Sequence, residues 1–134
     1  MTIAIDTNVL VRLLVRDDEA QYAAAQRLVD EAASDDEQVL IILGALLEAE
    51  WVLRSRYKLD KASIAGAFTA LLESADVEFE HPPTVEEALY VWAQYPGADF
   101  ADCLLIARAA HLGRNRFLTF DAGAACLPGV ELLV

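Results

Sequence analysis

Short apolar segments alternate along this chain with longer amphipathic stretches. The segments Val39–Ile42 and Val77–Phe79 are brief and rich in β-branched or aromatic residues, which is typical of buried strands. Between such segments, apolar residues recur at helical spacing, as in Ile64, Phe68 and Leu72. The pattern predicts strands at residues 2–5, 39–42, 77–79, 116–120 and 130–134, and helices at about residues 9–15, 17–32, 45–57, 61–74, 84–92 and 99–112.

This alternation predicts an α/β fold with a mostly parallel sheet flanked by helices. The 134 residues are an ordinary length for one domain, and they contain no internal repeat, low-complexity tract or linker. We therefore expect a single domain over residues 1–134. In parallel sheets, ligands bind outside the carboxyl ends of the strands, so the polar residues at that edge are the first candidates for function.

Five acidic residues fall at this predicted edge. Asp6 and Asp121 each follow a strand directly, and Glu48 lies near the start of the helix after the second strand. Asp99 and Asp102 begin the helix that leads into the fourth strand, and that helix must run antiparallel to the strand, so its start lies at the same edge. Carboxylate oxygens without His or Cys suit a hard cation, Mg²⁺ or Mn²⁺. Such ions can polarise a phosphodiester and activate a water molecule.

The composition argues against a membrane-spanning protein and against a secreted, disulfide-bonded one. The sequence is 56% hydrophobic with a mean hydropathy of +0.32, which predicts a buried oligomer interface or a standing partner. The longest apolar run, Val39–Leu47, contains Gly44 and falls far short of the roughly 20 residues that span a bilayer. Cys103 and Cys126 have no metal-like spacing, and we expect Cys103 to be a small core residue. With no signal peptide and no need for a disulfide, we expect a cytoplasmic protein that does not associate with a membrane.

The charge balance is strongly acidic. The chain has 22 acidic and 10 basic residues, a formal net charge of −12. Proteins that bind nucleic acid by neutralising phosphates are usually basic. This charge therefore argues against an RNA or DNA ligand unless bound divalent cations or a basic partner compensate for it.

Four ordered motifs carry a resemblance to a known family. They are Ile5-Asp6-Thr7-Asn8, Leu47-Glu48 leading into Trp51-Val52-Leu53-Arg54, Gly97-Ala98-Asp99-Phe100-Ala101-Asp102, and Thr119-Phe120-Asp121. In this order and at these separations they resemble the four acidic motifs of PIN-domain ribonucleases, and most of all the VapC-like toxins of bacterial type II toxin–antitoxin systems. The resemblance covers essentially the whole chain.

The resemblance implies a five-stranded parallel sheet in the order 3-2-1-4-5 and a Mg²⁺-dependent endonucleolytic cleavage of RNA, with Mn²⁺ as an alternative ion. It also implies a cognate antitoxin that blocks the acidic edge, and a homodimer. Gly44 departs from the pattern, since relatives often carry Ser or Thr there. The implied site residues are the catalytic and metal-binding acids Asp6, Glu48, Asp102 and Asp121, the further metal-binding acid Asp99, and Asn8 and Thr119, which would hold carboxylates or water by hydrogen bonds.

Several of these residues have plainer interpretations. Asp6 and Asp99 could each be only a helix N-cap, and Thr119 an ordinary strand residue. Arg12 could contact a phosphate or pair with the acids that follow it. Glu50 is expected to be solvated. Trp51 and Trp92 are expected in the core or an interface.

A rival reading from another class is a non-catalytic or phosphorylatable regulatory α/β domain. A receiver-like domain needs an acceptor Asp after the third strand, and residues 77–82 contain none. It also needs a Lys after the last strand, and none is present there. A metal-dependent nuclease assay separates a binding module from the nuclease reading.

Overall fold

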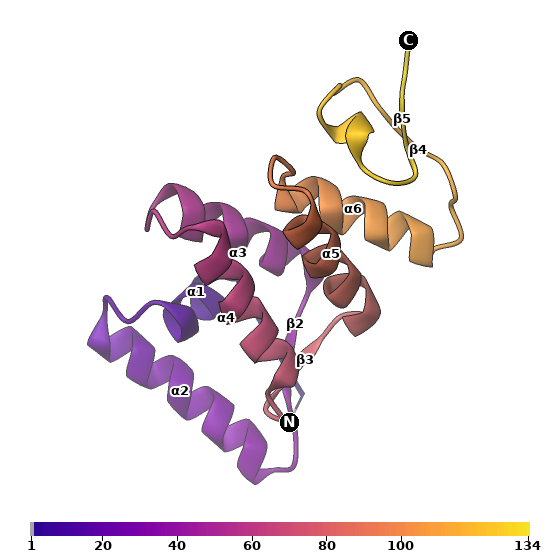
Figure 1. The fold of residues 1–134 in the computed structure, drawn as a ribbon. Coiled ribbons are helices and arrows are strands. Elements are labelled where there is room, and N and C mark those ends of the chain that lie inside the picture. Colours follow the sequence, from indigo (N-terminus) through magenta and orange to yellow (C-terminus); the bar gives the residue numbers. More distant parts are fainter. Residues whose placement is uncertain (1) are drawn as a thin grey trace. The chain divides into compact units, whose positions relative to one another are not determined.

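A computed structural model describes residues 2–134, and its strands and helices alternate as predicted (Figure 1). The chain divides into two compact units, one up to Pro82 and the other from Pro83, and each is described by itself. In chain order the elements are β1 (Ile3–Ile5), α1 (Thr7–Leu14), α2 (Glu19–Ser34), β2 (Val39–Ile41), α3 (Leu43–Ser55), α4 (Lys61–Glu73), β3 (Val77–Phe79), α5 (Pro82–Gln94), α6 (Phe100–His111), β4 (Phe117–Thr119), the short 3₁₀ helix η1 (Ala124–Cys126) and β5 (Val130–Leu132).

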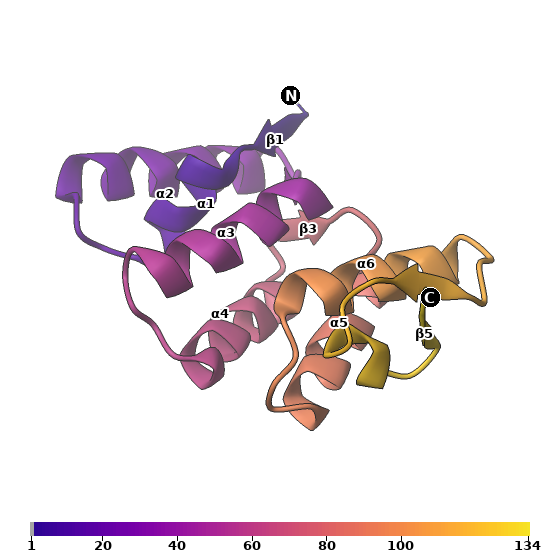
Figure 2. The same cartoon turned by 90° about the horizontal axis from the view of Figure 1, so that it is seen from above.

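The first unit is built on a parallel sheet in the order β1-β2-β3. Its register places Ile5 beside Ile41 and Ile41 beside Phe79, and all three side chains are buried. Because successive side chains of a strand point to opposite faces, these residues share the core face of the sheet. Helix α1 contacts both α2 and α3 (Figure 2). The largest fully buried side chains of helices α1, α3 and α4 are Leu10, Leu46, Leu53, Ile64 and Phe68.

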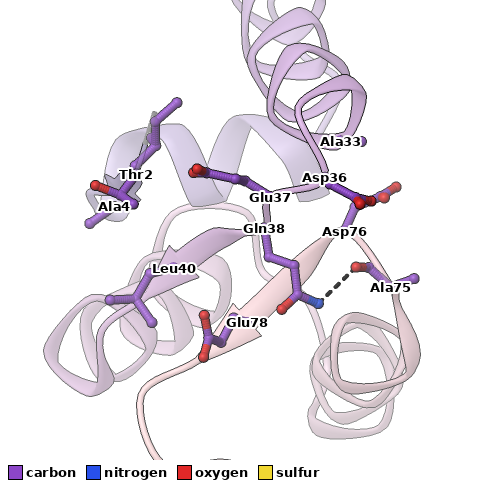
Figure 3. A pocket seen from close by; sticks show the side chains of 11 residues that line it. Thr2, Ala4, Ala33, Asp36, Glu37, Gln38, Leu40, Ala75, Asp76 and Glu78 are labelled. Carbon is purple, nitrogen blue, oxygen red and sulfur yellow. Dashed lines mark hydrogen bonds between the residues drawn. The ribbon is translucent and has the colours of Figure 1, made fainter.

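The opposite face of this sheet is less buried. Ala4 and Glu78 are exposed there, and Leu40 between them is half-buried. A hollow of about 800 Å³ lies over this face and the amino ends of the strands, where Asp36 and Asp76 also line it (Figure 3). None of the predicted site residues lines this hollow. It lies at the wrong end of the strands for a ligand of a parallel sheet, so we do not treat it as the functional site.

The second unit contains the parallel pair β4-β5, in which Thr119 lies beside Leu132. Its helices meet through Trp92 of α5 and Phe100 of α6, whose ring centroids are 5.0 Å apart. The Trp92 indole N–H also donates a hydrogen bond to the Ala98 carbonyl at 3.1 Å. These two contacts anchor the segment that leads into α6.

The α/β class and the parallel pairing of the strands are confirmed. The predicted order appears in two parts, 3-2-1 and 4-5, and the structure divides the strands between two sheets where the resemblance implied one. The pairing of the first strand with the fourth, which would join the parts, stays a prediction. Every strand is three residues long, shorter than predicted for four of them. Ile42 shows one reason, because it leaves the second strand to become the N-cap of α3.

Cys103 is buried and Cys126 is exposed, and the two form no disulfide, so Cys103 is the core residue that the sequence predicted. In the part of the chain that the structure describes, no helix combines the length and the apolar character needed to cross a bilayer.

Candidate active site

Asp6 sits at the junction between β1 and α1. Its backbone is extended, and its Oδ1 accepts a hydrogen bond from the Val9 N–H at 3.0 Å. Asp6 is therefore the N-cap of α1, as the plainer interpretation held. This cap engages Oδ1 and leaves Oδ2 outside it, so one carboxylate can serve the helix and still face a ligand.

Glu48 of α3 shares a hollow of about 440 Å³ with Asp6. The end of β1 and the start of α3 line this hollow, and both carboxylates are exposed. Asn8 lies on another side of Asp6, where both line a separate hollow with Leu28 of α2. The structure thus brings Asp6 and Glu48 together, as predicted. The expected hydrogen bond from Asn8 to a carboxylate or water stays a prediction.

The other three acids meet in the second unit. Asp99, Asp102 and Asp121 line one hollow of about 130 Å³. Asp99 occupies the N-cap position of α6, but its side chain makes no capping hydrogen bond, so capping does not explain why an acid stands there. Asp102 lies in the first turn of the same helix, where the helix dipole favours a negative charge.

Asp121 is held by the backbone around it. Its Oδ1 accepts hydrogen bonds from the N–H groups of Gly123 at 2.8 Å and Ala124 at 3.4 Å. Its own N–H donates to Thr119 Oγ1 at 3.0 Å, so Thr119 supports Asp121 through the main chain. A Cβ on Gly123 would lie 3.2 Å from Asp121 Oδ1, which is a crowded contact. Sequence reasoning missed Gly123, and its signal was an Asp-x-Gly spacing directly after a strand.

Crowding of like charges is visible at Asp102. Burial raises the pKa of its carboxyl, and the charges of Asp99 and Asp121 raise it further. A bound cation would act in the opposite direction. Within residues 2–134, no group of three or more His, Cys, Asp or Glu side chains is assembled closely enough to hold a metal ion. The donor chemistry nevertheless fits a hard cation, since the predicted acids offer only carboxylate oxygens.

A comparison with protein families bears on this chemistry. The family model described as the PIN domain matches residues 3–128. This chain belongs to the PIN-domain family. PIN domains are generally nucleases and typically use a divalent metal. The matched range runs through both units and includes every predicted site residue. A comparison with curated proteins gives no significant match.

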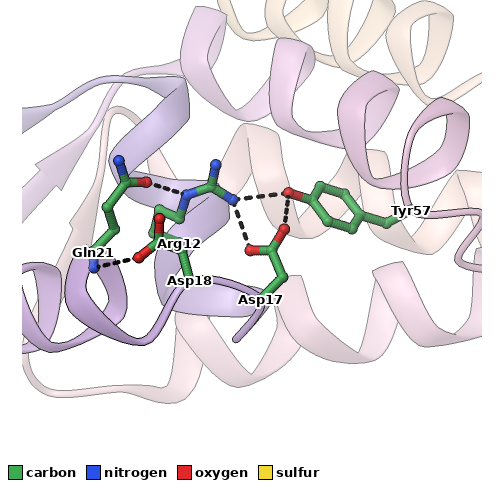
Figure 4. A network of polar contacts seen from close by, with 5 residues as sticks. All are labelled: Arg12, Asp17, Asp18, Gln21 and Tyr57. Atoms are coloured by element: carbon green, nitrogen blue, oxygen red, sulfur yellow. Dashed lines mark hydrogen bonds and ion pairs between the residues drawn. The ribbon is translucent and has the colours of Figure 1, made fainter.

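In this PIN domain, the Arg12 guanidinium is engaged in hydrogen bonds within the chain and is not available to bind a phosphate. Its Nη1 donates to Asp17 Oδ1 and to the Tyr57 hydroxyl, both at 2.8 Å (Figure 4). The Tyr57 hydroxyl in turn donates to Asp17 Oδ2 at 2.8 Å, and Gln21 Oε1 accepts from Arg12 Nε at 2.5 Å. Of the two roles considered for Arg12, pairing with the acids that follow it is the one found. The network ties the connection between α1 and α2 to the segment after α3.

One expectation about α3 of the PIN domain is corrected, and another is narrowed. Glu50 was expected to be solvated, but it is only 3% exposed. Its burial is compensated by Arg54 one turn later, whose Nε lies 2.8 Å from Glu50 Oε2. The two tryptophans were expected in the core or an interface: Trp92 is 3% exposed and lies in the core, whereas Trp51 is 54% exposed, so an interface is the place that stays predicted for it.

Proposed function

We propose that this PIN domain is a metal-dependent endoribonuclease that hydrolyses phosphodiester bonds in RNA. The observation that carries the proposal is that every predicted acid lines a hollow near the end of a strand. One hollow contains Asp6 and Glu48, and the other contains Asp99, Asp102 and Asp121. Their carboxylate chemistry favours Mg²⁺, with Mn²⁺ as a substitute.

The acids of the chain would hold the cation and set its surroundings. When bound, the cation would stabilise the charge that builds up on the phosphate and lower the pKa of a bound water. Asp6 and Asp121 are preorganised, because a backbone N–H fixes the Oδ1 of each. Thr119 keeps Asp121 in register through its hydrogen bond to the Asp121 N–H. Burial and the charges of Asp99 and Asp121 raise the pKa of the Asp102 carboxyl, and a bound cation would oppose this rise.

We propose further that this nuclease is the toxin of a type II toxin–antitoxin pair, acting in the cytoplasm as a homodimer with a cognate antitoxin as its partner. Support comes from the resemblance of its motifs to those of VapC-like toxins. The net charge of −12 also suits a partner with a basic segment. In the first unit, Trp51 and Ile42 are 54% and 45% exposed, which offers apolar surface to a partner.

The toxin role is tested by expressing the chain alone and together with the product of the adjoining gene. We expect growth arrest in the first case and relief in the second. Light scattering of the purified protein checks the dimer. Growth that continues during strong expression of soluble protein would count against a toxin.

The nuclease activity is tested with purified protein and total cellular RNA in Mg²⁺, in Mn²⁺ and in EDTA. We expect cleavage with either ion and none in EDTA, and sequencing the fragment ends identifies the substrate. Asp121→Asn keeps an oxygen to accept from the Gly123 N–H but removes the charge, so it should abolish cleavage. Asp60→Asn is the matched control, because Asp60 caps α4 by accepting from the Ser63 N–H at 2.8 Å and lies outside both hollows. Full activity in Asp121→Asn would show that the assignment of Asp121 is wrong.

A further inference from the structure

Helix α3, which carries Glu48, begins without a cap of its own. Its N-cap residue is Ile42, whose side chain cannot accept a hydrogen bond and makes none. The first N–H groups of a helix have no partner within the helix, and they are usually satisfied by a Ser, Thr, Asp or Asn at the N-cap. The start of α3 therefore depends on a partner from elsewhere in the chain.

Glu80 is that partner. Its Oε1 accepts a hydrogen bond from the N–H of Leu43, the first residue of α3, at 2.9 Å. Glu80 follows β3 directly, and its own N–H donates to the Ile41 carbonyl at 2.9 Å. The backbone of Glu80 is thus attached to the end of β2 while its side chain reaches the start of α3. A carboxylate in this place also suits the positive end of the helix dipole.

The chain turns sharply just after Glu80. His81 has a φ of 60°, in the left-handed region that a residue other than glycine adopts at a cost. The local structure therefore holds Glu80 in a defined backbone turn and not in a flexible loop. Sequence reasoning missed this residue, because a cap that comes from 37 positions away leaves no local signal.

Glu48 lies one turn further along α3 than the turn that Glu80 caps, on the same side as Gly44. Gly44, Ala45 and Glu48 line the hollow that contains Asp6. A Cβ on Gly44 would meet no atom within 4 Å, so no side chain packs against that point of the turn. On the side of the hollow the turn is held by the hydrogen bond at its start, and on its other side by the burial of Leu43 and Leu46.

We propose that Glu80 is a positioning residue for the active site, which fixes the first turn of α3 and through it the carboxylate of Glu48. This inference rests on the proposed nuclease function. Glu80 acts as a hydrogen-bond acceptor for Leu43 and does not touch the metal or the RNA. Small displacements of a catalytic group are costly, since about 1 Å can reduce a rate by about 100-fold.

The test compares Glu80→Ala, which removes the acceptor, with Glu80→Gln, which keeps an acceptor oxygen and loses the charge. Glu78→Ala is the matched control, because Glu78 is an exposed acid of β3, two residues before Glu80. For each protein, hydrogen exchange of the Leu43 amide, Mn²⁺ binding by titration, and kcat and KM for RNA cleavage are measured well below the melting temperature.

We expect Glu80→Ala to speed exchange at Leu43 by about five- to tenfold, the effect of losing a helix cap. It should weaken Mn²⁺ binding and lower kcat by about tenfold, with KM changed by less than about twofold, because Glu48 is misplaced and RNA binding is not. Glu80→Gln should stay within about threefold of the wild type in all measurements, and Glu78→Ala should match the wild type.

Three results would overturn the proposal. If Glu80→Ala exchanges faster at Leu43 but binds Mn²⁺ and cleaves RNA normally, Glu80 is only a structural cap. If Glu80→Gln is as inactive as Glu80→Ala while Leu43 stays protected, Glu80 acts through its charge. A wild-type protein that neither binds Mn²⁺ nor cleaves RNA overturns the nuclease function itself, a result distinct from the other two.

Discussion

Asp6 caps helix α1 and is also a proposed metal ligand, and a pair of substitutions can separate these two roles. Its Oδ1 caps α1 through the Val9 N–H at 3.0 Å, and its carboxylate shares a hollow with Glu48. Asn and Asp are about equally good N-caps, whereas Ala cannot cap. Asp6→Asn therefore removes the charge and keeps the cap, and Asp6→Ala removes both.

The expected magnitudes follow from this geometry. Asp6→Ala should lower the free energy of unfolding by about 1 kcal/mol, the usual cost of losing an N-cap. For a chain of this length, that corresponds to a fall of about 3–5 °C in melting temperature. Asp6→Asn should keep the stability of the wild type in metal-free buffer. Both variants should lose at least about 100-fold in Mg²⁺-dependent RNA cleavage, since each lacks an anionic metal ligand.

A matched control exists in α2. Asp18 is the N-cap of that helix, and its Oδ1 accepts from the Gln21 N–H at 3.0 Å, the same length as the Asp6 cap. Asp18→Ala should cost about the same stability as Asp6→Ala and leave cleavage intact. Thermal and denaturant unfolding in EDTA measure the first property, and initial rates of RNA cleavage measure the second. If Asp6→Asn cleaves RNA as well as the wild type, Asp6 is a cap and nothing more, and our reasoning about the site fails.

Three further predictions test the site and its support. Millimolar Mg²⁺ or Mn²⁺ should raise the melting temperature, because a ligand at about 100 times its Kd stabilises by about 2.7 kcal/mol, and the absence of any shift in differential scanning fluorimetry would count against a metal site. In EDTA, Asp102→Asn should stabilise the fold at neutral pH: burial and the charges of Asp99 and Asp121 raise the pKa of the Asp102 carboxyl, so its ionised form costs stability above that raised pKa. The gain should be no more than about 1 kcal/mol, because the group is partly exposed, and it should shrink as the pH falls towards the ordinary pKa of an aspartate; a gain that is independent of pH in urea titrations would contradict this cause. Trp92→Phe should cost about 1–2 kcal/mol of unfolding free energy because it leaves the Ala98 carbonyl without its indole donor, and a neutral result in denaturant unfolding would show that this hydrogen bond contributes little.

The sequence predicted the elements of this protein well because its signals are local. β-branched runs and helical spacing are properties of neighbouring residues, so the strands around Ile41 and Phe79 and the helices after them were found within a few positions. The acids were found for a related reason. In a parallel sheet the residue after a strand lies at a known edge, and this places Asp6 and Asp121 without any knowledge of packing.

What a side chain does at its position was decided by tertiary structure. Asp6 and Asp99 are both N-cap acids in the sequence, yet only Asp6 uses its carboxylate for the cap. Burial of Glu50 beside Arg54 and exposure of Trp51 depend on which side of α3 packs, and periodicity did not resolve this for two adjacent residues.

The sequence by itself determined the α/β class, the order of the elements and the acids at the strand ends, because each of these follows from local pattern and chain connectivity. Only the tertiary structure decided that the residue after β3 caps α3 with its carboxylate, that Gly123 makes room for Asp121, and that Arg12 is hydrogen-bonded to Asp17 and Tyr57. Such contacts join residues through the three-dimensional path of the chain. Hydrogen bonding selects them by distance and direction in space, and neither is written in the spacing of residues along the sequence.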